Sequence, residues 1–236
     1  MICITFDTDW MSDDAMGEFL SRIEWPGQAT FFLHQHLPVL HDSGHELCPH
    51  PFITDLEDWE EGLAAQAEAL PESPLGIRPH SCVFSHMLGL RFAELGYRYV
   101  SQTSHLYESG LKPHRHPWGL WEMPIYYMDN MDFCMGNNWG DLTHTPFESK
   151  VIERAVSEPG LYVFDFHPIH LALNTTCHED YTRVKADIVA GKVSPFELGG
   201  DGRGSRVFFQ ELCDAMTSAG QRSYSCSEAL AEYGVG

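Results

Sequence analysis

Residues 1–10 read MICITFDTDW, an apolar and β-branched run that ends in two acidic side chains. The composition of residues 2–8 predicts a β-strand that begins almost at the first residue. Ser12 then precedes Asp13 and Asp14, and a hydroxyl cap followed by acids predicts a helix that continues to about residue 23. A strand followed at once by a helix is the repeating unit of an α/β fold.

The rest of the chain continues this alternation. Strands are expected at residues 29–34, 44–48, 76–81, 97–101, 120–127, 160–166 and 221–225, and helices at 55–70, 85–95, 181–190 and 206–218. Residues 130–148 carry no clear period and are expected to form a long loop. The pattern predicts one α/β domain over residues 1–236, either a β/α barrel or a doubly wound sheet.

The composition argues against several classes of partner. Acidic residues number 34 against 14 lysines and arginines, so a net charge of -20 would repel nucleic acid and anionic membrane surfaces. No run of apolar residues is long enough to span a membrane. The initial strand leaves no room for a secretory signal. Seven cysteines without a C-x-x-C pair indicate reduced thiols, so we expect a cytoplasmic protein.

Asp7 and Asp9 are the first candidates for chemistry. They lie two residues apart on an extended segment, so both carboxylates can reach one point above the sheet. One could bind a cation while the other accepts a proton from metal-bound water. The alternative is that both acids cap the following helix or form an Asx-turn.

Histidines and an arginine follow two further predicted strands. His50 comes just after the 44–48 strand and before Pro51, where a neutral imidazole can bind a metal or simply lie on a surface turn. Arg78 and His80 would share one face of the 76–81 strand. An arginine there could keep a neighbouring carboxylate ionised, and the alternative is a surface arginine beside a structural histidine.

His167 directly follows the very apolar strand at 160–166. A polar residue at that end of such a strand faces an active cleft more readily than a core, although a structural role stays open. His170, three residues later, is expected at the surface or behind the reacting groups.

The order of these segments is more specific than any one of them. It resembles the polysaccharide deacetylase family, the NodB-homology domain of carbohydrate esterase family 4. The resemblance covers about residues 1–225 and depends on Thr5-Phe6-Asp7-x-Asp9, Ala29-Thr30-Phe31-Phe32, Gly44-His45-Glu46-Leu47 before His50, Arg78-Pro79-His80, and Phe164-x-Phe166-His167.

The resemblance implies an irregular, incomplete (β/α) barrel of about seven strands that holds one divalent metal ion, with zinc expected. It implies a metal-dependent hydrolase that removes N-acetyl groups from an amino sugar or polysaccharide precursor. Asp7 would be the general base, Arg78 its orienting partner and His167 the general acid. Asp9 and His50 would bind the metal. Asp129 would lie behind His167 as its partner.

Two departures from the family pattern matter. A second histidine usually follows four residues after the first, and Thr54 stands there. We therefore expect His80 to be the third metal ligand, with Asp55 and His45 as weaker substitutes. Arg-Pro-His-Ser also replaces the usual arginine, proline and aromatic residue, which resembles a divergent branch associated with surface-polysaccharide biosynthesis.

Two other functions remain open at this point. The chain could hydrolyse another non-peptide C–N bond, or it could be a catalytically silent barrel that binds carbohydrate. Trp10, Trp139 and Tyr127 are candidates for stacking on a sugar ring, with core packing as the alternative.

Overall fold

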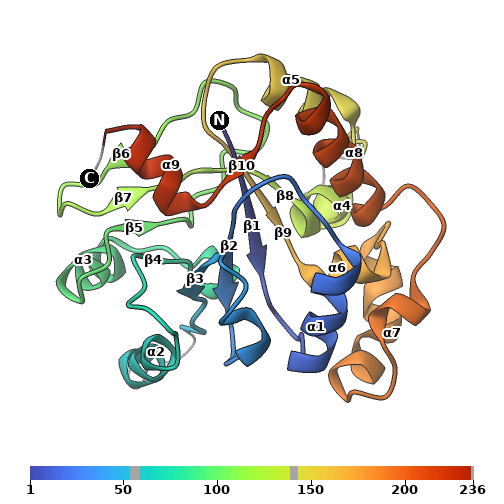
Figure 1. Cartoon of the computed structure of the whole chain (residues 1–236), viewed down its shortest axis with the longest axis horizontal. Helices are drawn as coiled ribbons and strands as arrows, with labels where there is room; N and C mark the ends of the chain where they lie inside the picture. Colours follow the sequence, from blue (N-terminus) through green and yellow to red (C-terminus); the bar gives the residue numbers. More distant parts are fainter. Residues whose placement is uncertain (54–58, 139–142, 235–236) are drawn as a thin grey trace.

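The computed structural model describes residues 1–53, 59–138 and 143–234, and alternates strands with helices along most of its length (Figure 1). The strands are β1 (Ile2–Asp7), β2 (Ala29–Leu33), β3 (Glu46–Pro49), β4 (Gly76–Ile77), β5 (Tyr99–Val100), β6 (His114–Arg115), β7 (Trp121–Glu122), β8 (Ile125–Met128), β9 (Tyr162–Phe166) and β10 (Ser223–Tyr224). The helices are α1 (Asp13–Arg22), α2 (Trp59–Glu68), α3 (His86–Glu94), α4 (Asp129–Asn138), α5 (Ser149–Ser157), α6 (Pro168–Leu173), α7 (His178–Val189), α8 (Ser205–Ser218) and α9 (Cys226–Glu232), and 3-10 turns lie at Pro38–Leu40, His80–Cys82 and Pro195–Leu198.

The strands form two sheets. The first has the order β3-β2-β1-β9-β8, with β10 paired to the start of β1, and all its pairs are parallel. The second has the order β4-β5-β7-β6, and only β6 runs antiparallel to its neighbour. Parallel neighbours need crossover connections, and helices supply several of them, such as α1 between β1 and β2 and α2 between β3 and β4.

The two sheets join into one ring. The Arg78 N–H donates to the Pro49 carbonyl at 3.2 Å, which links β4 to β3. On the other side β7 runs on into β8, and the Ile125 N–H donates to the Thr103 carbonyl at 2.9 Å, just beyond β5. In the described residues the ring therefore reads β1, β2, β3, β4, β5, β7 with β8, and β9. This is the expected irregular (β/α) barrel.

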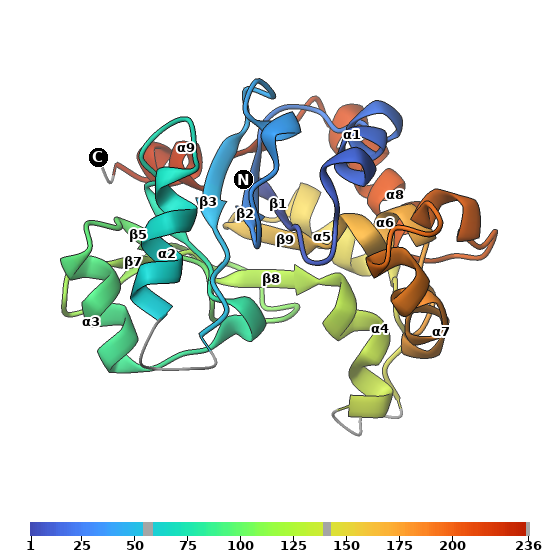
Figure 2. The ribbon, with the colours of Figure 1, turned by 90° about the horizontal axis from the view of Figure 1, so that it is seen from below.

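Side chains fill the interior of the ring. Its interior near the strand starts is an apolar cluster, closed by Cys226, Ala229 and Leu230 of α9. A larger cluster lies between the first sheet and helices α1, α5, α6 and α8. Figure 2 shows α2 and α3 on the opposite side of the molecule from α1, α6 and α8. The carboxyl ends of the strands are left for polar side chains.

The cap predicted for the first helix is confirmed. The Ser12 hydroxyl accepts a hydrogen bond from the Ala15 N–H and caps α1. Gly96 follows α3 with a φ of 94°, in the left-handed region that favours glycine at a helix end. Among the helices of the described ranges, none is both long and apolar enough to cross a membrane.

Other predictions need correction. Residues 130–148 are not one loop, because α4 occupies Asp129–Asn138. The strand expected at 120–127 is divided into β7 and β8 around Pro124, since proline has no N–H for the ladder. The strand expected at 76–81 stops at Ile77 for the same reason, two residues before Pro79. Helices α5, α6 and α9 were not expected, and residues 55–58 of the helix predicted at 55–70 lie outside the described residues.

Candidate active site

The six side chains selected from the sequence gather at the carboxyl ends of the strands. A cavity of about 400 Å³ lies there. Arg78 does not line the cavity but is fully buried in the barrel, where it contacts Asp7. The other five, Asp7, Asp9, His50, His80 and His167, line the cavity.

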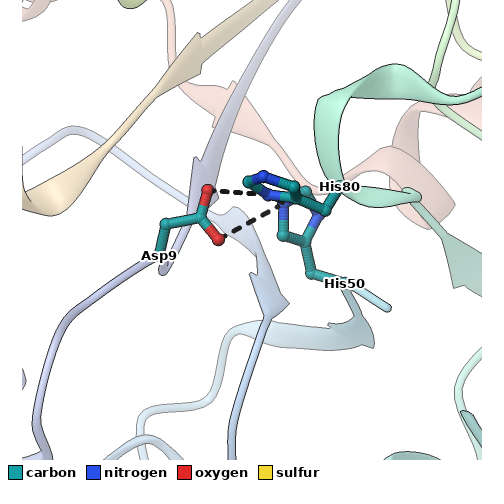
Figure 3. A group of neighbouring side chains, drawn as sticks. All are labelled: Asp9, His50 and His80. Carbon is teal, nitrogen blue, oxygen red and sulfur yellow. Dashed lines mark hydrogen bonds and ion pairs between the residues drawn. The ribbon is translucent and has the colours of Figure 1, made fainter. Parts of the chain in front are cut away.

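Asp9, His50 and His80 form a compact donor cluster (Figure 3). An Asp9 carboxylate oxygen lies 3.1 Å from His80 Nδ1, and the other lies 3.7 Å from His50 Nε2. The two imidazole nitrogens are 3.3 Å apart. Although burial alone would raise the pKa of Asp9, the two histidines hold it well below its usual range.

This cluster fits a divalent metal ion. The His50 Nδ1–H donates to the Arg78 carbonyl at 2.7 Å, which leaves Nε2 on the Asp9 side as the nitrogen that would bind an ion. Asp9 Oδ1 is buried and accepts no hydrogen bond in the described part of the chain. One carboxylate oxygen and two imidazole nitrogens are a donor set suited to zinc and similar ions.

His80 reaches the cluster by a route different from the expected strand alternation. It begins the 3-10 turn His80–Cys82, and its N–H donates to the Pro51 carbonyl at 2.9 Å. Phe52 stacks on its ring with centroids 3.9 Å apart and an interplanar angle of 28°. His80 is the most exposed of the three cluster side chains, and packing by Phe52 holds its imidazole in place.

Arg78 lies between two buried carboxylates. Its Nη1 donates to Asp7 Oδ1 at 2.8 Å and also contacts Asp165 Oδ1. Its remaining nitrogens donate to Ser101, at 2.9 Å to the carbonyl and 2.8 Å to the hydroxyl. Burial disfavours a charged Asp7, but Arg78 together with His50 and His167 outweighs burial and lowers the pKa of Asp7.

Asp165 was missed by the sequence analysis. It is fully buried on the same strand face as His167, accepts from the Thr5 hydroxyl at 2.9 Å, and leaves Oδ2 without a described partner. Burial together with the neighbouring Asp7 charge outweighs the attraction of Arg78 and raises the pKa of Asp165 to about 7. The sequence did carry a signal for Asp165, because it stands two residues before His167, a spacing that puts both side chains on one face of an extended segment.

His167 is held from behind by Asp129, as expected. The Asp129 carboxylate accepts from His167 Nδ1 at 2.8 Å and from the His167 backbone N–H at 3.0 Å. Burial would lower the pKa of His167, but this carboxylate raises it to about 10. His167 Nε2 is 3.9 Å from Asp9 Oδ2 and so lies beside the donor cluster.

His170 is not a surface residue. It is 4% exposed, lines the cavity, and its Nδ1 lies 3.2 Å from the Thr175 hydroxyl. Burial lowers the pKa of His170 to about 3, so its ring is neutral. The turn of α6 after Pro168 brings it back toward His167, with ring centroids 5.2 Å apart.

The remaining sequence candidates lie elsewhere. His45 is outside the cavity, with Nδ1 3.1 Å from Gln28 Oε1, and Tyr127 is a core residue whose hydroxyl donates to Asp132 at 3.2 Å. Trp10 packs under the Lys185 ammonium, 4.3 Å from its ring centroid. The other candidates, Thr54, Asp55 and Trp139, lie outside the described residues.

Comparison with solved structures identifies the fold. A Bordetella bronchiseptica protein assigned as a polysaccharide deacetylase in O-antigen biosynthesis superposes with a TM-score of 0.73 at 24% identity, covering 90% of this chain and 89% of that one. A Mycobacterium smegmatis protein assigned as a polysaccharide deacetylase gives 0.54 at 18% identity, covering 98% and 88%. A Clostridium thermocellum family 4 acetyl xylan esterase with a cobalt ion gives 0.54 at 12% identity, covering 100% and 92%.

Family membership comes from the sequence itself. A search of curated proteins finds no match. Residues 4–185, more than half of the chain, match the family model described as WbmS-like polysaccharide deacetylase. The chain therefore belongs to the WbmS-like polysaccharide deacetylase family.

Proposed function

We propose that this chain is a metal-dependent hydrolase that removes an N-acetyl group from an amino sugar or polysaccharide precursor. The observation that carries the proposal is the Asp9, His50 and His80 cluster, which shares one cavity with Asp7 and His167. Three protein ligands with room for a water molecule and a substrate are typical of catalytic zinc sites, and zinc is the ion we propose.

Two other groups of metal-binding side chains in the described residues support the proposal less well. The group Asp129, His167 and His170 has its Asp129 carboxylate committed to His167 Nδ1. The group Asp7, Asp165 and His167 has both carboxylates on Arg78. A cation there would compete with a buried guanidinium, whereas the ion pairs that Asp9 makes within the described residues are with histidines.

Each reacting side chain has a role that its contacts support. A bound divalent ion would polarise the amide carbonyl and make a water molecule easier to deprotonate. Asp7 would take the proton from that water, because Arg78 holds Oδ1 and leaves Oδ2 on the side of the cluster, 3.6 Å from His50 Nε2. Because Arg78 helps to keep the Asp7 carboxylate ionised, Asp7 is suited to act as a base.

His167 would then give a proton to the departing amine. Its Nε2 lies on the cavity side, while Asp129 holds Nδ1 and stabilises the imidazolium. A histidine oriented by a buried carboxylate is a common general acid, worth about 10²–10⁴ in rate.

The relatives lend further support. The acetyl xylan esterase of similar fold holds a cobalt ion, and the Bordetella relative is assigned to O-antigen biosynthesis, so a surface carbohydrate is the substrate class we propose. We take residues 1–236 as one catalytic domain, because β10 near the C-terminus pairs with β1. The seven free thiols favour a reducing, cytoplasmic location.

The test measures bound metal and acetate release together. Asp9→Ala should lose both metal and turnover. Asp7→Asn should keep the metal and lose at least about 100-fold in kcat, because only a proton acceptor is removed. His45→Ala, an imidazole outside the cavity, is the matched control and should keep both.

Three outcomes would contradict the proposal. Full metal occupancy in Asp9→Ala would show that Asp9 is not a metal ligand. Sugar binding without any acetate release would indicate the carbohydrate-binding barrel. Release of an amine only from substrates without a sugar would indicate another amidase.

A further inference from the structure

A groove lies at the end of the barrel opposite to the active-site cavity. It has a volume of about 600 Å³, and its lining includes Tyr97, Arg98, Arg115, Trp118 and Trp121, none of which lines the active-site cavity. Arg98 directly precedes β5 and Trp121 begins β7, so the groove opens at the amino ends of these parallel strands. Figure 1 shows β5, β6 and β7 between α3 and α9, and we call this site the arginine groove.

The two arginines of the groove have no acidic partner in the part of the chain that the structure describes. Arg98 and Arg115 are both exposed and form no ion pair there, whereas Arg91 pairs with Glu60 at 2.7 Å. Acidic residues outnumber basic ones 34 to 14 in this chain, yet no aspartate or glutamate is among the described residues that line the groove. The arginine groove is therefore a positive site on an acidic protein and favours an anion.

Aromatic rings give the groove a fixed wall. Trp118 stacks on His116 with ring centroids 4.9 Å apart and an interplanar angle of 5°. Gly89 of α3 approaches the same indole so closely that a Cβ on Gly89 would lie 2.7 Å from it. Tyr97 adds a half-buried ring. Because these contacts hold Trp118 in place, the wall exists before a ligand binds.

Trp121 lies between the two arginines in the sheet. Its backbone N–H donates to the Arg98 carbonyl at 2.9 Å on one side, and on the other side Trp121 pairs in register with Arg115 of β6. Neighbouring strands are about 4.8 Å apart, so the segments that carry the two arginines are about 10 Å apart. The groove therefore offers a cation, an aromatic ring and a second cation in that order.

This order matches an acidic polysaccharide. A guanidinium group binds a carboxylate through two parallel N–H donors, and an aromatic ring can cover the apolar face of a sugar. Consecutive uronic acid units carry a carboxylate on every ring, so one chain can reach both arginines while a pyranose rests on Trp121. An acidic peptide would meet the arginines but offers no sugar ring to the indole. Membership of a polysaccharide deacetylase family also favours a glycan.

We propose that the arginine groove is a second carbohydrate site, which binds a uronic acid-containing polysaccharide through Arg98, Arg115 and Trp121. The proposal goes beyond the hydrolase function, because binding in this groove needs neither the metal ion nor an N-acyl group. The groove would hold one part of a polymer away from the cavity where hydrolysis is proposed.

The experiment compares cellotriose with cellotriouronic acid, in which each primary alcohol is oxidised to a carboxylate. Dissociation constants are measured by calorimetry at low salt. The acid should bind at least about tenfold more tightly than the neutral sugar, since only the acid satisfies the guanidinium groups. The preference should shrink in about 0.5 M salt, because both arginines are exposed to solvent.

Matched variants locate the site. Arg98→Ala and Arg115→Ala should each weaken binding of the acid at least about fivefold and leave cellotriose within about twofold. Trp121→Leu keeps an apolar side chain but removes the ring, so it should weaken both trisaccharides. Arg183→Ala changes the net charge by the same amount outside the groove, and is the control that should bind as wild type does.

The outcomes separate this inference from the proposed function. Asp9→Ala should keep full affinity for the acid, and a loss there would place the ligand in the active-site cavity and overturn the proposal. Equal affinity for the two trisaccharides, or an equal loss in Arg183→Ala, would also overturn it. So would tighter binding of glucose 1-phosphate than of glucuronic acid, or equal binding of a glutamate trimer. Absence of acetate release would remove the hydrolase and leave the groove standing.

Discussion

Asp165→Asn tests the electrostatics of the barrel interior. Asp165 and Asp7 share the single guanidinium of Arg78, and all three are buried. Asp7 is attracted further by His50 and His167, whereas for Asp165 full burial and the Asp7 charge outweigh the attraction of Arg78 and His167. The proton that the site retains therefore belongs to Asp165, whose pKa is raised from 3.8 to about 7.

The sign and size of the effect follow from linkage. Between about pH 4 and pH 7 the folded chain keeps a proton on Asp165 that the unfolded chain has lost, so the free energy of unfolding falls as pH rises. Each pH unit costs about 1.4 kcal/mol, which gives about 2 kcal/mol between pH 5 and pH 6.5. The stabilisation is complete below about pH 4 and is lost as pH passes through the folded pKa. Asparagine has no proton to lose, so the variant should lack this slope.

The assay is urea unfolding of wild type and Asp165→Asn at half-unit steps from pH 5 to 6.5. The difference in unfolding free energy between the two proteins should change by about 2 kcal/mol across the range, with the variant gaining on wild type as pH rises. Asp42→Asn, at an exposed carboxylate, is the control and should run parallel to wild type. Parallel curves for Asp165→Asn as well would refute the assignment of the proton.

Other substitutions test other parts of the site. His80→Ala should weaken zinc binding at least tenfold, about 1.4 kcal/mol, in a chelator competition, and a loss seen in His45→Ala instead would show another third ligand. Asp129→Ala should lower kcat about 100-fold with metal retained, because His167 loses its orienting carboxylate, and unchanged kcat would remove that role. Asp132→Ala should lower the free energy of unfolding by about 3 kcal/mol, since two tyrosine hydroxyls, an imidazole and a backbone N–H lose their acceptor, and calorimetry that finds less than about 1 kcal/mol would contradict this.

The sequence predicted the fold class and which side chains lie together at the strand ends, while several element boundaries differ from the prediction. Asp7, His50 and His167 could be placed because each stands at or just after the end of an apolar strand, and parallel strands bring their carboxyl ends together. His80 lies in the expected place for a different reason. Pro79 ends the strand, and a turn with Ser81 and Cys82 at positive φ, 57° and 51°, carries the imidazole into the cavity.

What the sequence did not reveal depends on distant contacts. Helix α4 has little apolar periodicity, and its Asp132 is held by tyrosines 25 and 5 residues away in the chain. Asp165 looked like one polar residue in a core strand, because its partner Arg78 comes 87 positions earlier. Short-range patterns carry no information about pairs that meet only inside the closed ring of strands.

A crystal structure of the zinc-loaded protein with anomalous data at the zinc edge would test the metal assignment most directly. The account predicts one anomalous peak at about 2.0–2.2 Å from an Asp9 carboxylate oxygen, His50 Nε2 and His80 Nδ1. A peak between Asp129 and His170, or no peak in the cavity at saturating zinc, would contradict it.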